Sequence, residues 1–159
     1  MSIFAQDAQK EVETRNRIPM PVTEQEVVLQ EIGISLASAS PDEWKKVHFQ
    51  CDALVDTANV KFGVVRPGDS RDRTRPSMDV SKKMRELRNG MYSQGKGTWL
   101  TDHHIATRPG KYSIDYGTEP DFTIPPVAGS RKLDLQYFPR DDEHIPDWLR
   151  RKLQEEKNE

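Results

Sequence analysis

The sequence predicts an α+β fold, in which an antiparallel sheet of about four strands, built as two hairpins, has helices packed on one side. Three observations support this prediction. Apolar residues alternate along two pairs of segments, helical spacing governs the stretches beside them, and short links join the members of each pair. A chain of 159 residues suits one domain. We therefore expect a polar N-terminal arm over residues 1–22 and a single α+β domain over residues 23–159.

The first helix is expected to run from Thr23 to the serine-rich stretch before Pro41. Thr23 and Glu26 have the spacing of a capping box, in which each side chain accepts the backbone N–H of the other residue. The apolar residues that follow at helical spacing are Val28, Leu29, Ile32 and Leu36. They predict an amphipathic helix.

A hairpin is expected next, over residues 44–55 and 59–66. In its first strand the apolar face holds Val47, Phe49, Cys51, Ala53 and Val55. His48, Gln50 and Asp52 fall on the other face, which is the period of a half-buried strand. Residues 67–77 have no periodicity and many turn-forming residues, so they predict an exposed loop.

The second half of the chain predicts a helix, a second hairpin and a last helix. Ser77 or Asp79 caps a helix whose buried stripe is Val80, Met84, Leu87 and Met91. The faces that remain hold Lys82, Lys83, Arg85 and Arg88. Residues 98–107 and 111–116 form the hairpin, and the residues expected to face one another are Trp99, Thr101, His103 and Ile105 against Tyr112, Ile114 and Tyr116. The last helix starts at Pro146, with Trp148, Leu149 and Leu153 on one face.

The residues that could carry chemistry do not assemble into a known catalytic pattern. His103 and His104 are neighbours on a strand and point to opposite faces, so they are poorly placed to share a metal. Cys51 lies on an apolar face and is expected to be a buried small hydrophobe. Residues 90–97 lack the phosphate-loop spacing. The acids at 141–143 are explained by the helix dipole that follows them. We expect no enzyme activity, metal or cofactor.

Positive charge is concentrated in one segment. The chain has a net charge of −2, whereas residues 66–96 carry nine basic and four acidic side chains. The loop within that segment contains Arg66, Arg71, Arg73 and Arg75. It has no aromatic residue for stacking on bases, so a guanidinium array that binds carboxylates on an acidic protein fits better than a nucleic-acid site. The alternative is a solvated loop with self-compensating charge.

A second candidate contact region lies in the N-terminal arm, where a charged segment could enter a cleft. Its residues are Lys10, Glu11, Arg15 and Arg17.

Hydropathy and cysteine content bear on cellular location. No run approaches the roughly 18 apolar residues that span a bilayer, and the N-terminus lacks the pattern of a secretory signal. One cysteine excludes an internal disulfide framework. These features predict a cytoplasmic protein without a membrane partner.

The C-terminal third carries a family resemblance. The sequences Gly95–Trp99, Lys111–Tyr116 and Tyr137–Leu149 occur in succession, the last containing FPRDDEHIPDWL. Over roughly residues 40–153 the chain resembles actinobacterial members of the YezG-like immunity proteins, in particular those encoded beside polymorphic or necrotising toxins. Within the last motif, Phe138, Ile145, Trp148 and Leu149 are expected to clamp the last helix onto the sheet.

The resemblance implies a cytoplasmic antitoxin that binds one protein toxin domain and blocks its active site. One branch of such toxins hydrolyses NAD and others are nucleases, so the resemblance implies either an NAD glycohydrolase or a nuclease as the toxin that is inhibited. Two rival functions stay open: a metal-dependent hydrolase that uses His48, His104 and Asp102, and an RNA-binding regulator that uses the basic segment from Arg66 to Arg88. The sequence leaves the oligomeric state open.

Overall fold

The computed structural model describes residues 19–73 and 75–158, so most of the expected N-terminal arm lies outside the described residues. Within them, one antiparallel sheet has the strand order β3-β2-β1-β4-β5. Its strands are β1 (Lys46–Leu54), β2 (Thr57–Val65), β3 (Arg71–Arg73), β4 (Thr101–Thr107) and β5 (Lys111–Gly117). The helices are α2 (Val22–Ser38), α3 (Met78–Gly90), α4 (Ser130–Tyr137) and α5 (Asp147–Lys157), with a 3-10 turn η1 (Asp142–His144).

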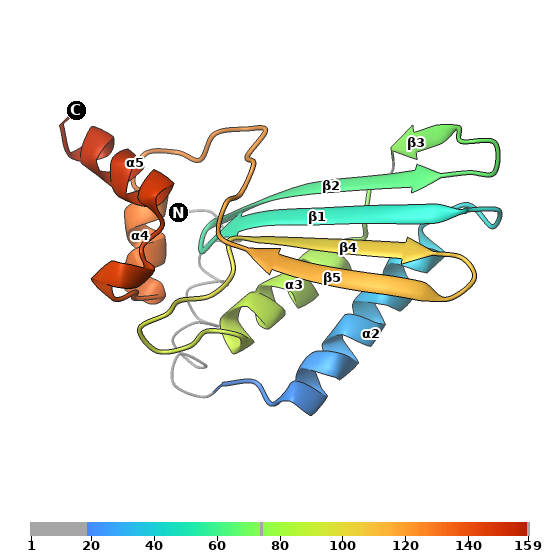
Figure 1. Ribbon diagram of the computed structural model, residues 1–159, viewed down its shortest axis with the longest axis horizontal. Helices are drawn as coiled ribbons and strands as arrows, with labels where there is room; N and C mark the ends of the chain where they lie inside the picture. The colour runs from blue at the N-terminus through green and yellow to red at the C-terminus, as the bar shows by residue number, and fades with distance from the viewer. Residues whose placement is uncertain (1–18, 74, 159) are drawn as a thin grey trace.

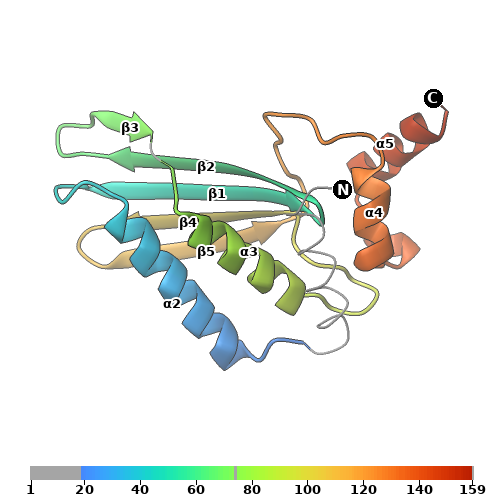
Figure 2. The same cartoon turned by 180° about the vertical axis from the view of Figure 1, so that it is seen from behind.

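The two long helices lie on one face of the sheet. Figure 2 shows α2 and α3 in front of the strands, and Figure 1 shows the opposite face, which no helix of the described chain covers. We call this second face the open face. α4 and α5 lie at the end of the sheet where β1 turns into β2, far from the β2–β3 turn. The α+β prediction is confirmed.

The core lies between the sheet and its two long helices. Alternation along β1 turns Val47, Phe49 and Cys51 toward the helices, where each is at most 3% exposed. In α3 the buried residues of the predicted stripe are Val80, Met84 and Leu87. In α2 the buried residues are Val28, Ile32 and Leu36. The periodic apolar positions therefore pack as the sequence predicted.

The sheet has five strands where the sequence predicted about four. The prediction that residues 67–77 form a loop throughout is wrong, because Arg71–Arg73 pairs with β2 as a short edge strand. Val65 faces Arg71 and Gly63 faces Arg73 in this register. A three-residue strand has too few positions for alternation to be visible in the sequence.

The capping box predicted at Thr23 is also wrong. α2 begins one residue earlier, after Pro21, and its N-terminus has no side-chain cap. The preceding Met20 is buried and its N–H donates to the carbonyl of Gly90 at 2.8 Å. This contact ties the entry of α2 to the end of α3, so tertiary contacts rather than a local cap fix the start of the helix.

The predicted facing of the second hairpin is shifted by one residue. His104 faces Ile114 and Asp102 faces Tyr116, so the residues opposite Tyr112, Ile114 and Tyr116 are even-numbered and not the predicted odd-numbered ones. Asp102 and His104 lie on the helix-covered face. A one-residue shift exchanges the two faces of a strand, and the buried polar pair is accepted because its members bond to one another.

The last helix packs on α4 at the end of the sheet. Leu149 is 1% exposed, whereas Trp148 is partly exposed and donates its Nε1–H to the carbonyl of Thr118 at 2.5 Å. Leu149 is therefore the buried anchor of α5. Among the described helices none is long and apolar enough to cross a membrane.

Candidate functional site

The open face holds a broad groove of about 740 Å³. Its floor is formed by side chains of the three central strands, among them His48, Gln50, Lys61 and His103. These residues share one face because strand residues alternate and because His48 pairs with Gly63 and Gln50 with Lys61. The hairpin pattern of the sequence thus placed the polar side of β1 correctly, on a surface that solvent can reach.

One wall of the groove is the segment that follows β5. Lys61 donates from Nζ to the carbonyl and the carboxylate of Asp121, at 3.2 and 3.1 Å. Asn59 and Thr123 lie 3.5 Å apart at their side-chain polar atoms. These contacts hold Ile124, which is 76% exposed, beside the sheet. A large apolar side chain therefore stands at the rim of a polar groove.

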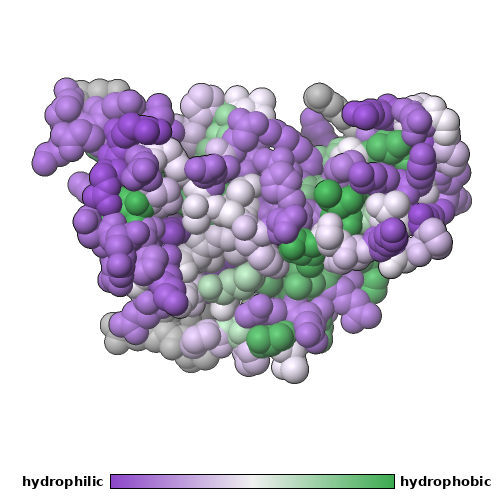
Figure 3. All heavy atoms as spheres, viewed as in Figure 1, coloured by the Kyte–Doolittle hydropathy of each residue, from purple (hydrophilic) through white to green (hydrophobic). Residues whose placement is uncertain are grey.

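Figure 3 looks onto this face and shows patches of hydrophobic atoms among hydrophilic ones. This face therefore offers both apolar and charged side chains to a binding partner.

The charge at the β3 side of the groove is positive. Arg75 lines the groove, and Arg71 is exposed on the adjoining edge strand. Burial, together with the charges of Lys46 and Arg71, lowers the pKa of His48 below its usual value. His48 is therefore neutral at pH 7, and the positive field comes from lysine and arginine side chains.

The four arginines predicted as contact residues do not act as one array. Arg66 donates from Nε to Asp72 at 2.6 Å and also contacts Glu43, so the charge of this arginine is compensated within the chain, as the alternative for this loop expected. The hydrogen bond to Asp72 raises the pKa of Arg66. Arg71 and Arg75 are exposed.

The remaining predicted contact residues lie partly or wholly outside what the structure describes. Arg73 is placed by its backbone pairing with Gly63, and its side chain is not among those described. The arm residues lie outside the described residues: Lys10, Glu11, Arg15 and Arg17.

A chain of three polar side chains lies beneath the sheet on the helix-covered face. His104 Nε2 is 2.7 Å from the Asp102 carboxylate, and His104 Nδ1 is 2.5 Å from the Tyr112 hydroxyl. Burial raises the pKa of Asp102 despite the neighbouring histidine. It also raises the pKa of Tyr112, so this phenol is a poor source of a nucleophilic oxygen at neutral pH.

The hydrolase constellation considered above does not form. His104 and Asp102 are at most 1% exposed on the helix-covered face, whereas His48 is exposed on the open face. The predicted opposite orientation of His103 and His104 is confirmed. Cys51 is 2% exposed, and burial raises the pKa of its thiol, which agrees with a packed core residue.

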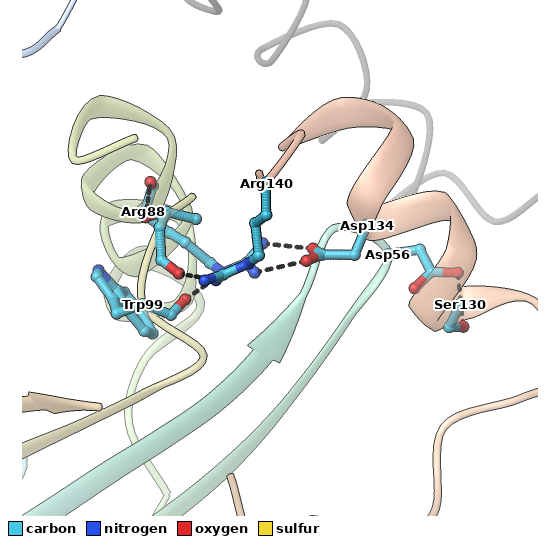
Figure 4. Close-up of polar contacts among 7 residues, drawn as sticks. Asp56, Arg88, Trp99, Ser130, Asp134 and Arg140 are labelled. Atoms are coloured by element: carbon cyan, nitrogen blue, oxygen red, sulfur yellow. Dashed lines mark hydrogen bonds and ion pairs between the residues drawn. The ribbon is translucent and has the colours of Figure 1, made fainter. Parts of the chain in front are cut away.

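Two of the resemblance motifs meet at the end of the sheet around Arg88, a buried arginine that was predicted to lie outside the apolar stripe of its helix. Arg88 of α3 makes two contacts with the Asp134 carboxylate of α4, at 2.8 and 3.0 Å, and both side chains are buried (Figure 4). Its Nε–H donates to the carbonyl of Trp99 at 2.8 Å, and its guanidinium lies 4.7 Å from the ring centre of Phe138. Arg88 and Asp134 thus join α3, α4 and the segment that precedes β4.

A second arginine, Arg140, connects the FPRDDEH motif to the Gly95–Trp99 motif. Arg140 donates to the carbonyls of Lys96 and Thr98. Gly97 has a φ of +86°, and a Cβ at this position would overlap the Arg140 guanidinium. The Gly95–Trp99 and FPRDDEH motifs therefore contact each other, and these contacts stabilise the fold.

The acids of the last motif form a loose cluster. Ligand atoms of Asp141, Glu143 and His144 lie within 4.8 Å of one another, and both acids are exposed. An exposed group of this kind is explained by its position before α5.

The basic segment proposed for RNA is divided by the fold. Arg66 has two carboxylate partners, and Arg88 is 3% exposed.

No protein-family model matches the sequence, and no match was found among curated proteins.

Proposed function

We propose that this protein is an immunity protein that binds a cognate toxin domain through the open face and occludes the toxin's active site. The observation that carries the proposal is the groove, which is lined by the exposed apolar Ile124 and the exposed Arg75, with Arg71 exposed on the adjoining edge strand. Inhibition by occlusion needs a rigid surface with complementary charge and requires no catalysis or cofactor. The proposal places the protein in the cytoplasm.

The chemistry of the surface suggests how the partner is recognised. Arginines at the rim favour an acidic partner surface and speed the encounter, while desolvated apolar anchors slow release. The family resemblance supplies the class of partner, an NAD glycohydrolase or a nuclease domain. Neither nucleic acid nor a membrane is part of the proposal.

The test is a titration of the toxin domain encoded beside this gene. Purified protein should abolish the toxin's NAD hydrolysis or nuclease activity at a stoichiometric ratio. The double substitution Arg71→Glu/Arg75→Glu should weaken binding at least tenfold, about 1.4 kcal/mol, and make the on-rate less sensitive to salt.

The matched control makes the same charge change elsewhere. Lys132→Glu/Arg151→Glu alters exposed residues of α4 and α5, at the opposite end of the sheet from β3 (Figure 1). It should bind as the wild type does. Equal affinity of the two double variants would exclude the open face, and removal of residues 1–18 would then test Lys10, Glu11, Arg15 and Arg17.

A further inference from the structure

The two edges of the sheet differ in a way that bears on assembly. β3 is a three-residue edge, whereas β5 has seven residues, pairs with β4 without a bulge and contains no proline. In the described part of the chain, no strand pairs with the outer side of β5. A long and regular edge with free backbone groups is a template for another strand.

The backbone groups that β5 turns outward follow from the register. The Ala53 N–H donates to the carbonyl of Leu100 at 3.0 Å, and the Arg108 N–H donates to that of Lys45 at 3.1 Å. Even-numbered residues of β4 therefore turn their backbone groups toward β1, and odd-numbered residues turn theirs toward β5. Since Thr101 pairs with Gly117, the odd-numbered residues of β5 bond to β4. The residues of β5 that turn N–H and C=O outward are Tyr112, Ile114 and Tyr116.

The side chains of β5 form a pattern that is complementary to itself. On the open face, Lys111 and Asp115 are exposed, and neither has an ion-pair partner among the described residues. On the other face, Tyr112 and Tyr116 are 46% and 39% exposed on either side of Ile114. Opposite charges thus stand four residues apart on one face, and apolar residues occupy the other.

We propose that β5 pairs antiparallel with β5 of a second copy of this chain, about a two-fold axis at Ser113. In this register Lys111 faces the partner's Asp115, and Tyr112 faces the partner's Ile114. Each contact occurs twice because the interface is symmetric. The outward backbone groups of Tyr112 and Ile114 then bond to the partner's Ile114 and the partner's Tyr112.

Charge selects this register over its neighbours. Sliding the pairing by two residues places the axis at Ile114 and leaves Lys111 opposite the partner's Gly117. A further slide by two places the axis at Asp115, where two carboxylates face each other. Opposite charges directly across a strand pair stabilise it and like charges destabilise it. The axis at Ser113 is the arrangement that satisfies both charged residues.

The dimer has a consequence for the open face. Paired strands keep matching side chains on one side, so the two sheets form a continuous ten-stranded sheet with both open faces on the same side. The two grooves then face the same direction. Because β5 lies outside the groove's lining, the pairing does not depend on the proposed toxin contact.

The full-length protein tests the pairing by sedimentation velocity from about 10 µM to about 1 mM, a range suited to a small interface. The wild type should show a reversible monomer–dimer equilibrium. Asp115→Lys should raise the dissociation constant of the dimer at least about fivefold, because two opposite-charge pairs become two like-charge pairs. The double variant Lys111→Asp/Asp115→Lys should restore it.

A backbone variant tests the edge itself. Ile114→Pro removes an outward N–H and leaves the bonds to β4 intact, so it should abolish the dimer while the circular dichroism spectrum is unchanged. A wild type that stays monomeric up to about 1 mM overturns the proposal. Failure of the charge-swapped variant to recover overturns the register. If the wild type is monomeric and Ile114→Pro loses toxin binding, the edge serves the toxin and the second-copy proposal is wrong.

Discussion

Replacing Asp134 by alanine leaves the Arg88 guanidinium buried without its counter-ion. Both side chains are at most 3% exposed, and the two groups make contacts of 2.8 and 3.0 Å. Removing one partner of a buried pair costs about 3–5 kcal/mol, because the charge that remains is desolvated without compensation. For a chain of 159 residues this loss lowers the melting temperature by about 10 °C.

An exposed ion pair with the same nitrogen–oxygen distance serves as a control, because it differs from Arg88–Asp134 in burial and not in distance. The Arg150 Nη1 lies 2.8 Å from the Asp142 carboxylate, but Asp142 is 90% exposed. Asp142→Ala should leave the melting temperature almost unchanged, because water replaces the lost partner. Thermal melts followed by circular dichroism compare the two variants directly.

A third variant distinguishes charge from packing. Arg88→Met/Asp134→Leu removes both charges, so it should be more stable than Asp134→Ala. Recovery is incomplete because the carbonyl of Trp99 loses its donor. The reasoning is refuted if Asp134→Ala melts within about 2 °C of the wild type, or no lower than Asp142→Ala.

Three further predictions concern packing, backbone conformation and pH. Leu149→Ala should cost about 2–5 kcal/mol and Trp148→Ala less, measured by urea unfolding, because Leu149 is fully buried and Trp148 is partly exposed. Gly97→Ala should destabilise more than Gly110→Ala in thermal melts, because both have a φ of +86° but a Cβ meets another side chain at Gly97 and open space at Gly110. The pKa of Asp102 is raised on folding, so the folded state keeps this proton at pH values where the unfolded chain has lost it, and stability falls as pH rises through the raised pKa. Asp102→Asn should therefore gain melting temperature relative to the wild type at pH 7 and show little gain at pH 4; a gain independent of pH would contradict this.

The elements that were predicted well depend on local spacing. Val80, Met84 and Leu87 recur at helical intervals, and Val47 and Phe49 alternate, so short segments show which side is apolar. The same alternation placed His48 on the open face. Periodicity identifies buried positions whenever the residues that fill them are apolar.

The groove on the open face and the buried pair Arg88–Asp134 were predicted less well. Arg88 follows Met84 by four residues, so helical spacing already placed it beside the buried stripe, and its charge led to the opposite assignment. A signal was therefore present. Its partner Asp134 is 46 residues away in sequence, and nothing near either residue indicates the pairing.

The sequence by itself determined the α+β class, the first hairpin, the stripe of α3 and the basic character of residues 66–96. Tertiary structure decided the fifth strand, the register of β4 with β5, the burial of Arg88 and the groove on the open face. The division has a physical cause. Local periodicity reports which side of an element is apolar, whereas a short strand, a buried charge and a groove are each stabilised by partners distant in the chain.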